Sequence, residues 1–188
     1  MNADEIVLQT VDALRSGRTI LYPTDTIWGI GCDARRADAV ERLYSIKERD
    51  HTKSMLVLVR SMEACGMELP EAPDGRPTTY ILPEAMWRRL LGNTVADNLP
   101  AADGSLGIRV PQHPFCQEVM RRLGAPLVST SANLSGHPSP ATYADIEEAL
   151  RARVDHCVPP LPEFESHESR GSRIVKLEAD GRQTVIRP

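Results

Sequence analysis

The densest run of small polar side chains in this sequence lies between positions 129 and 139. It holds hydroxyls, an amide and a glycine directly after an apolar stretch, from Ser129 through Ser131 and Asn133 to Gly136, with a further hydroxyl at Ser139. Such residues let backbone N–H groups approach a bound anion closely, and α/β proteins bind ligands beyond the carboxyl ends of strands. The run matches neither Gly-x-x-x-x-Gly-Lys nor Gly-x-Gly-x-x-Gly. It favours a ligand site over a spacer, one that would hold a nucleotide in some other way.

Three cations lie close together between positions 47 and 53. Lys47, Arg49 and Lys53 follow a helix-like stretch and lead into an apolar one. One interpretation is that cations at the C-terminal end of a helix are stabilised by the helix dipole. The other is that they converge on a polyanion such as a triphosphate, to which Arg offers a planar fork and Lys a point charge. The residues alone leave both interpretations open.

A third polar group follows an apolar run near the N-terminus. Thr24, Asp25 and Thr26 place two hydroxyls and a carboxylate shortly before Gly29, where the backbone can turn tightly. An ordinary turn that caps itself through these side chains is the competing explanation. By itself this group does not distinguish a ligand site from a turn.

Two arginines complete the candidates for binding chemistry. Arg109 follows an apolar triplet and Arg187 stands next to the last residue, so each is either a ligand-binding cation or a solvated one. The four cysteines are far apart without a Cys-x-x-Cys pair, and the five histidines lack the spacing of metal ligands. No Ser-His-Asp or Cys-His order indicates covalent catalysis. The residues predict an anion site without a covalent nucleophile and without a metal held by protein side chains.

Helical and strand-like stretches alternate along the chain, and these elements must position the polar groups. Apolar periodicity and capping signals predict helices over 3–15, 37–48, 84–91, 115–123 and 142–151. Short apolar runs predict strands over 19–22, 55–59, 78–82, 106–110, 126–128, and a terminal hairpin of 174–177 and 184–186. The alternation is typical of an α/β domain with a mixed sheet. We expect one domain over 1–188, with a polar loop from 129 to 140 and a mobile loop at 159–172.

Length and composition are those of an ordinary globular chain. The 188 residues are 41% hydrophobic and 26% charged, which excludes disorder as the main state. The longest apolar runs fall well short of the roughly 20 residues of a membrane helix. A net charge of −4 argues against general nucleic-acid binding, although a local basic patch is compatible with it. With an acidic N-terminal stretch and no signal-peptide pattern, we expect a cytoplasmic protein without membrane contact.

Four segments in a fixed order carry a recognisable pattern. They are Leu21–Asp33 (LYPTDTIWGIGCD), the pair Lys47-x-Arg49, Ser105–Pro114 (SLGIRVPQHP) and Pro126–Pro140 (PLVSTSANLSGHPSP). Together they resemble the L-threonylcarbamoyladenylate synthases of the Sua5/YrdC/YwlC family, whose hallmark is Lys-x-Arg followed far downstream by Ser-x-Asn. The resemblance spans nearly the whole chain, and the length suits the single-domain bacterial type.

The resemblance implies a fold, a reaction and partners. The fold is a single YrdC-like α/β domain, in which a twisted mixed β-sheet with flanking helices forms a concave, positively lined cavity. The reaction joins L-threonine, bicarbonate and ATP into L-threonylcarbamoyl-AMP and releases pyrophosphate, with Mg²⁺ accompanying ATP. A partner transferase then passes the threonylcarbamoyl group to adenosine 37 of tRNA, with which a transient contact is implied.

The resemblance also assigns residues to each substrate. Lys47 and Arg49 are implied to be the catalytic pair that faces the phosphates. The residues implied to bind ATP are these two together with Lys53, Ser105, Ser131, Asn133, Ser139 and Arg187. The residues implied to bind threonine are Thr24, Thr26, Arg109, Ser129 and Ser172. Of these, Arg109 would take the carboxylate, and no protein side chain is implied to bind the metal.

Two alternatives stand beside this interpretation. One is a non-catalytic YrdC-like protein that binds RNA or ribosomes through the same cavity, which the presence of both hallmark motifs disfavours. The other is a plain nucleotide-binding or nucleotide-hydrolysing protein. ATP hydrolysis with no requirement for threonine would favour that second alternative.

Overall fold

One mixed sheet is the framework of the fold. The computed structural model describes residues 1–48, 55–63, 69, 74–140, 142–164 and 170–188. Within these ranges the strands are β1 (Ile20–Tyr22), β2 (Gly29–Asp33), β3 (Leu56–Leu58), β4 (Thr78–Leu82), β5 (Leu106–Arg109), β6 (Leu127–Ser131), β7 (His156–Cys157), β8 (Arg173–Leu177) and β9 (Gln183–Arg187). They form a single sheet in the order β7-β1-β2-β6-β3-β5-β4-β8-β9. The pairs β1–β7, β3–β5 and β4–β8 are parallel, and the other neighbours are antiparallel.

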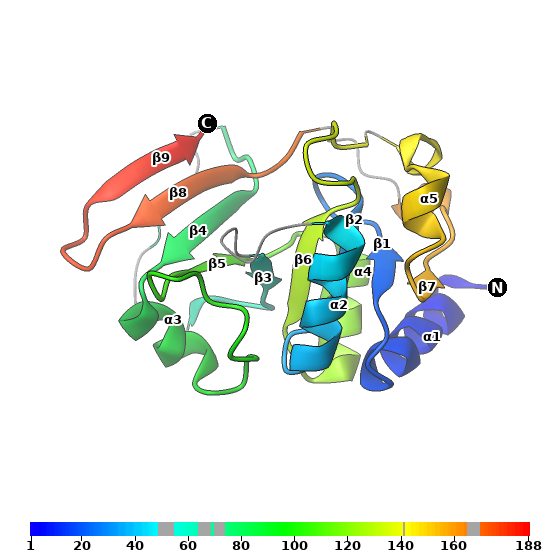
Figure 1. Cartoon of the computed structure of the whole chain (residues 1–188), viewed down its shortest axis with the longest axis horizontal. Coiled ribbons are helices and arrows are strands. Elements are labelled where there is room, and N and C mark those ends of the chain that lie inside the picture. Colours follow the sequence, from blue (N-terminus) through cyan, green and yellow to red (C-terminus); the bar gives the residue numbers. More distant parts are fainter. Residues whose placement is uncertain (49–54, 64–68, 70–73, 141, 165–169) are drawn as a thin grey trace.

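Helices flank this sheet on both faces (Figure 1). They are α1 (Ala3–Arg15), α2 (Ala37–Lys47), α3 (Glu84–Leu91), α4 (Pro114–Leu123) and the short α5 (Glu148–Arg151). Two 3₁₀ turns, η2 (Tyr143–Asp145) and η3 (Pro162–Phe164), lie in the connections on either side of α5 and β7. No helix in the described ranges is long and apolar enough to cross a membrane.

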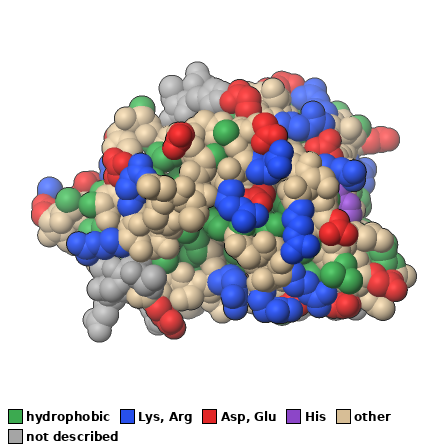
Figure 2. All heavy atoms as spheres, turned by 90° about the horizontal axis from the view of Figure 1, so that it is seen from below, with side chains coloured by type: hydrophobic (Ala, Val, Ile, Leu, Met, Phe, Trp, Pro, Cys, Tyr) green, Lys and Arg blue, Asp and Glu red, His purple; other side chains and the backbone are tan. Residues whose placement is uncertain are grey.

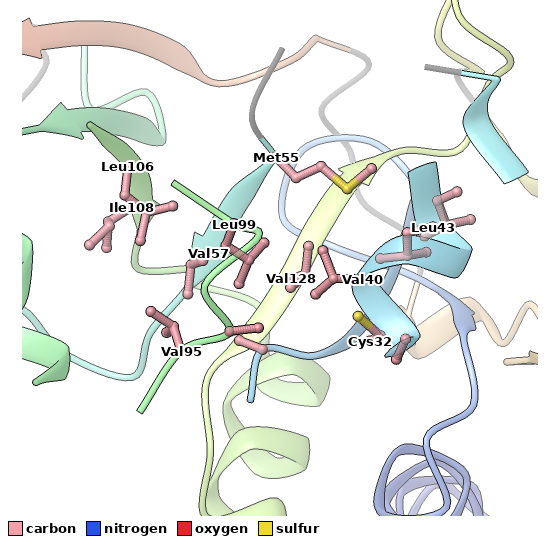
Figure 3. Packing of buried hydrophobic residues seen from close by; sticks show 14 of the residues in the cluster. Cys32, Val40, Leu43, Met55, Val57, Val95, Leu99, Leu106, Ile108 and Val128 are labelled. Carbon is pink, nitrogen blue, oxygen red and sulfur yellow. The ribbon is translucent and has the colours of Figure 1, made fainter. Parts of the chain in front are cut away.

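Two hydrophobic clusters lie on opposite faces of the sheet. Val57 and Val128 belong to the cluster covered by α2 and α3, whereas their chain neighbours Leu58 and Leu127 belong to the cluster beneath α1 and α4. Successive side chains of a strand point to opposite faces, which separates the two clusters. Figure 3 shows the first cluster, in which Val128 faces Val40 of α2. Each such fully buried aliphatic side chain stabilises the fold by about 1.5–3 kcal/mol relative to exposure.

The helices α1 and α4 cover only part of their face. They pack against each other, and the cluster beneath them draws on β1, β3 and β6. Among the described residues, this cluster takes no side chain from β4, β5, β8 or β9. The same face of those four strands is therefore left available for a ligand site.

The start of the first helix follows the predicted capping box. Asn2 Oδ1 accepts a hydrogen bond from the Glu5 N–H at 2.9 Å, and Glu5 Oε2 accepts one from the Asn2 N–H at 3.0 Å. The helix is followed by Gly17 at φ 76°, a conformation that glycine adopts readily. The other predicted helices and strands are confirmed to within one or two residues at each end, apart from the differences below.

The predicted helix over 142–151 is wrong as one continuous element. Thr142 and Asp145 do form the expected capping box, but it starts only the 3₁₀ turn η2. Ile146 then returns to an extended conformation before α5 begins at Glu148. Ile146 is buried in the core, so its packing overrides the local helical preference.

The polar loop expected from position 129 begins later than predicted. β6 continues through Ser131, and Ser129 and Thr130 pair with Gly31 and Ile30 of β2. Neighbouring strands satisfy the backbone of this polar stretch, so its composition does not end the strand. The two-residue β7 was not predicted because so short a strand leaves no periodic signal.

The loop expected to be mobile at 159–172 is partly outside the described residues. Its first part contains η3, whose Phe164 is buried and packs on Phe115 with ring centroids 5.0 Å apart. His113 Nε2 lies 3.1 Å from the Phe164 carbonyl oxygen. Residues 165–169 lie outside the described ranges, so the mobility of the loop stays a prediction.

Candidate functional site

A cavity of about 300 Å³ lies on the sheet face that α1 and α4 leave uncovered. Its floor is one row of paired residues across four strands. Ser129 of β6 pairs with Leu56 of β3, Leu56 with Gly107 of β5, and Gly107 with Ile81 of β4. Directly paired residues point to the same face of a sheet, so all four side-chain positions open into the cavity.

Glycines and a tyrosine shape this floor. A Cβ at Gly107 would lie 3.4 Å from Leu56 Cβ, whereas a Cβ at Gly31 would lie 2.2 Å from the Val128 carbonyl oxygen and 3.0 Å from the Tyr22 ring. The Tyr22 ring lies close over Gly31, and its hydroxyl donates to Ser129 Oγ at 2.7 Å. Burial raises the pKa of Tyr22, which keeps the phenol protonated and able to orient Ser129.

Arg109 is a buried cation that lines the cavity. It is 3% exposed, its Nη1 donates to Thr26 Oγ1 at 2.8 Å, and its Nη2 lies 3.4 Å from Asp25 Oδ1. Its Nε is buried without a hydrogen-bond partner in the part of the chain that the structure describes. A buried charge is stable only where partners compensate for lost water. A guanidinium with one long ion pair and a spare donor is suited to binding a carboxylate.

Arg187 is the second cation of the cavity. It comes from the last strand, where it pairs with Ile174 of β8. Its Nε and Nη2 donate to the Ser172 carbonyl oxygen at 2.8 and 2.5 Å, and the absence of a side chain on Gly171 leaves room for the guanidinium. Burial and the charge of Arg109 both lower the pKa of Arg187. Two like charges close together repel, and a bound anion would relieve that repulsion.

Hydroxyl groups surround these two cations. Thr24 Oγ1 lies 3.0 Å from Thr26 Oγ1 and donates to the Ile27 carbonyl oxygen at 2.7 Å. Thr79 Oγ1 of β4 and Ser172 Oγ, just before β8, are hydrogen-bonded at 2.7 Å. Among the described residues that line the cavity, none carries a carboxylate. The cavity thus offers cations and hydroxyls to an anionic ligand.

The predicted Lys-x-Arg and Ser-x-Asn motifs meet beside the cavity. Lys47 is buried, and its Nζ donates to the Ser131 carbonyl oxygen at 2.7 Å and lies 3.1 Å from Asn133 Oδ1; it also donates to the Asn133 carbonyl oxygen. Ser131 Oγ donates to Asn133 Oδ1. The ammonium therefore joins the end of α2 to the loop after β6. Arg49 and Lys53 lie outside the described residues.

The structure brings most of the predicted site residues together. Those that line the cavity are Thr24, Arg109, Ser129, Ser131, Ser139, Ser172 and Arg187. Three others do not line the cavity but contact residues that do: Thr26 contacts Arg109, and Lys47 and Asn133 contact Ser131. Ser105 does not line the cavity, and its hydroxyl donates to Asp103 Oδ1 at 2.6 Å. Its assignment to ATP stays a prediction.

Three contributors were missed from the sequence. Tyr22, Asp25 and Thr79 contact Ser129, Arg109 and Ser172, residues that are more than 80 positions away along the chain. Asp25 had a visible signal, since it stands between two threonines that were assigned. Tyr22 and Thr79 lie within strands and carry no local signal of a site.

The described residues contain no cluster of His, Cys, Asp and Glu that could hold a metal ion. The donor set of the cavity suits a metal that is coordinated mainly by phosphate oxygens, as Mg²⁺ is in many nucleotide sites.

A family model matches almost the entire chain. It is that of the Sua5/YciO/YrdC family, described as "Telomere recombination", and it covers residues 12–188. The chain belongs to the Sua5/YciO/YrdC family. The resemblance seen in the four sequence segments is thereby confirmed.

Relatives in this family carry a consistent name. "Threonylcarbamoyl-AMP synthase" of Methylococcus capsulatus is 34% identical over 158 residues, which cover 79% of this chain and 81% of the relative. The protein of the same name from Xanthomonas campestris is 37% identical over 161 residues, covering 77% and 80%. "Putative threonylcarbamoyl-AMP synthase" of Mycobacterium tuberculosis is 34% identical over 188 residues, covering 97% and 83%. These names agree with the enzyme class that the sequence motifs imply.

Solved structures of the Sua5/YciO/YrdC family share the fold. P. abyssi Sua5 complexed with L-threonine superposes with a TM-score of 0.77 at 21% identity, and the match covers 100% of this chain and 55% of that one. E. coli YciO superposes with a TM-score of 0.69 at 22% identity, covering 99% and 89%. At these identities the likeness establishes the fold alone. The predicted α/β class with a twisted mixed sheet is confirmed.

Proposed function

We propose that this protein makes L-threonylcarbamoyl-AMP from L-threonine, bicarbonate and ATP and releases pyrophosphate. One observation carries the proposal. The cavity places two guanidinium groups, Arg109 and Arg187, among hydroxyls, and no described residue of its lining is a carboxylate. Such a site suits a substrate pair with a carboxylate at one end and a triphosphate at the other.

The threonine end of the site is proposed at Arg109. Its unpaired Nε and long contact to Asp25 leave donors for the substrate carboxylate. Thr24, Thr26, Ser129 and Ser172 are the candidates for the amine and the side-chain hydroxyl of threonine. A site that hydrogen-bonds a substrate hydroxyl can reject an analogue lacking it by about ten-thousandfold, because its own polar groups are left unpaired.

The nucleotide end is proposed around the loop after β6. Ser131 and Ser139 line the cavity there, Ser131 Oγ donates to Asn133 Oδ1, and Arg187 lines the same cavity. Lys47 and Arg49, with Lys53, are proposed to serve the phosphates. Mg²⁺ bound by the phosphate oxygens would neutralise further charge.

The chemistry needs no covalent bond to the protein. The threonine amine takes up bicarbonate to form a carbamate, with loss of water. A carbamate oxygen attacks the α-phosphorus of ATP, and the bond to pyrophosphate breaks. The protein's part is to hold the two substrates in line and to stabilise the charge on the phosphates, which are the main sources of catalysis in such transfers.

The product is a mixed anhydride that must be consumed by a second protein. We propose that this protein acts in the cytoplasm with a transferase that passes the threonylcarbamoyl group to adenosine 37 of tRNA. The protein itself makes at most a transient contact with that tRNA. The net charge of −4 favours handing over the adenylate rather than stable tRNA binding.

The test is direct detection of the product. The protein is incubated with ATP, Mg²⁺, L-threonine and ¹⁴C-bicarbonate, and the label is followed by thin-layer chromatography. We expect a labelled adenylate and an equal amount of pyrophosphate. ATP hydrolysis at a rate that does not depend on threonine would support the hydrolase alternative instead. RNA binding without any use of ATP would support the non-catalytic alternative.

A further inference from the structure

Asp25 occupies an unusual place behind the cavity. It stands in the turn after β1 between Thr24 and Thr26, its side chain is 10% exposed, and it does not line the cavity. Nothing in the proposed reaction uses it. A carboxylate so buried loses much of its hydration, so its partners determine what it does.

The carboxylate of Asp25 joins two distant parts of the fold. Its Oδ2 accepts a hydrogen bond from the Gln112 N–H at 2.9 Å, and its Oδ1 lies 3.4 Å from Arg109 Nη2. Arg109 ends β5 and Gln112 follows it, whereas Asp25 follows β1. In the sheet, β2, β6 and β3 lie between β1 and β5. The turn after β1 therefore reaches across three strands to hold the end of β5.

Two side chains of this one turn hold the Arg109 guanidinium. Thr26 accepts from Nη1 at 2.8 Å while Asp25 is ion-paired with Nη2. Asp25 Oδ1 and Arg109 Nε are both buried and both lack a hydrogen-bond partner within the described ranges. The guanidinium is thus fixed in place, yet its bonding capacity is not used up by the protein.

We infer that Asp25 is a positioning residue for amino-acid recognition, which holds Arg109 so that its remaining donors meet the carboxylate of the substrate. This inference rests on the proposed function of the cavity. An arginine has several rotatable bonds, and holding it in its bound geometry reduces the entropy lost on binding. The negative charge of Asp25 also offsets the repulsion between Arg109 and Arg187, which share the cavity.

The decisive variant is Asp25→Asn. An amide oxygen can still accept from the Gln112 N–H, but the ion pair with Arg109 is lost. We expect KM for threonine to rise about tenfold, as for the loss of one charge-assisted contact, while kcat and KM for ATP stay within about twofold. A general loss of structure would change all three parameters together.

A matched control is available at the end of β2, the strand that follows the turn holding Asp25. Asp33 is also a buried carboxylate and pairs with Arg35 at 2.6 Å, and it does not line the cavity. Asp33→Asn likewise removes the charge of a buried carboxylate that pairs with an arginine, here the partly exposed Arg35, without touching Arg109. We expect its KM for threonine to equal that of the unmodified protein.

A ligand analogue separates positioning of Arg109 from other effects. L-Threoninol lacks the carboxylate, so its binding cannot depend on a carboxylate–guanidinium contact. By calorimetry, Asp25→Asn should weaken threonine binding about tenfold and leave threoninol binding unchanged. In the double variant Asp25→Asn/Arg109→Lys, threonine should bind no more weakly than in Arg109→Lys alone, because Asp25 acts through Arg109.

Two results would overturn the inference while leaving the proposed function intact. The first is that the unmodified protein forms the adenylate and the Asp25→Asn variant has the same KM for threonine. The other is an equal loss of threonine and threoninol binding. If Asp25→Asn does not fold, Asp25→Glu, which keeps the negative charge but moves the carboxylate relative to Arg109, must show the same selective loss. An unmodified protein that neither binds threonine nor forms adenylate would instead refute the proposed function.

Discussion

Arg109 and Arg187 share one cavity but are held in different ways. Arg109 is tied to side chains of the turn after β1, whereas Arg187 is tied to the backbone of Ser172 at the start of β8. The spare donor of Arg109 is buried, and Arg187 comes from the exposed edge strand β9. On these contacts we propose Arg109 for the small carboxylate of threonine and Arg187 for the nucleotide.

Arg109→Lys should raise the requirement for threonine more than that for ATP. Lysine keeps the charge but cannot make the bidentate contact of a guanidinium. We expect at least about a tenfold rise in KM for threonine, equivalent to about 1.4 kcal/mol. Steady-state titration of each substrate measures this. Arg187→Lys is the matched control and should show the opposite pattern; equal effects in both variants would contradict the assignment.

Lys47→Ala should abolish most adenylate formation. Loss of a charged contact that acts on the transition state commonly costs about 3 kcal/mol, or about a hundredfold in rate. Because Lys47 Nζ also bonds to Ser131 and Asn133, we expect a lower melting temperature as well. Turnover at saturating substrates and thermal unfolding are the two measurements. Wild-type turnover in this variant, or in Arg49→Ala, would contradict a role at the phosphates.

Residue types alone indicated part of the site. The dense hydroxyl run after position 128 indicated an anion site, and the resemblance added Ser172, which the structure does place in the cavity. Asp25 was visible but had no assigned partner, since its contact with Arg109 joins residues that are far apart along the chain. Such long-range contacts depend on strand order, which no local pattern encodes.

Strand register, rather than any single loop, builds the floor of the cavity. Ser129, Leu56, Gly107 and Ile81 meet because four strands pair in one register. A shift by one residue would turn every one of these side chains to the other face. The glycines in β2 and β5 are the positions where this arrangement is most sensitive to substitution.

Gly31→Ala and Gly107→Ala should differ in stability. The added Cβ would lie 2.2 Å from the Val128 carbonyl oxygen in the first variant but 3.4 Å from Leu56 Cβ in the second. We expect Gly31→Ala to lower the free energy of unfolding by about 1–3 kcal/mol or more, since backbone cannot move aside cheaply. Gly107→Ala should fold normally but bind ligand less well, because its methyl enters the cavity. Urea denaturation measures both, and equal stabilities would contradict the described register.

At the level of elements, the sequence predicted helices better than the ends of polar strands. α1 has an apolar stripe and a capping box, and both are found in the structure. β6 continues through Ser129 and Thr130 because β2 and β3 pair with it on both sides. Composition favoured a loop there, and sheet pairing overrode it.

The chain carries similar numbers of charges of both signs, 22 Lys and Arg against 26 Asp and Glu. Figure 2 shows one face with many Lys and Arg side chains and with Asp and Glu side chains between them. The described residues also form ion pairs near the surface, such as Arg42 with Asp155 and Arg153 with Glu48. Each such pair contributes about 0–1 kcal/mol. Anion binding therefore has to arise locally, from the two cations that line the cavity, the buried Arg109 and Arg187 of the edge strand.

The stability of the whole domain should fall in mild acid. Burial lowers the pKa of His113 below the 6.5 of an imidazole in water, and burial together with the charge of Arg18 lowers that of His156. Between the folded pKa and 6.5 the unfolded chain binds more protons than the folded one, so the free energy of unfolding decreases as pH decreases through that window. Urea denaturation from pH 8 to 5 measures this. His113→Gln should flatten the pH dependence; an unchanged slope would contradict the buried, neutral state of this ring.

The central claim is that one cavity activates threonine and bicarbonate with ATP, and pyrophosphate exchange tests it most directly. The protein is incubated with ATP and ³²P-pyrophosphate, with threonine and bicarbonate supplied together, singly or not at all. Reversal of adenylate formation returns label to ATP only when the adenylate can form. We predict exchange that requires both threonine and bicarbonate and that is largely lost in Arg109→Lys at low threonine. Exchange that proceeds equally well when threonine or bicarbonate is left out would contradict the account. So would the absence of exchange when both are present.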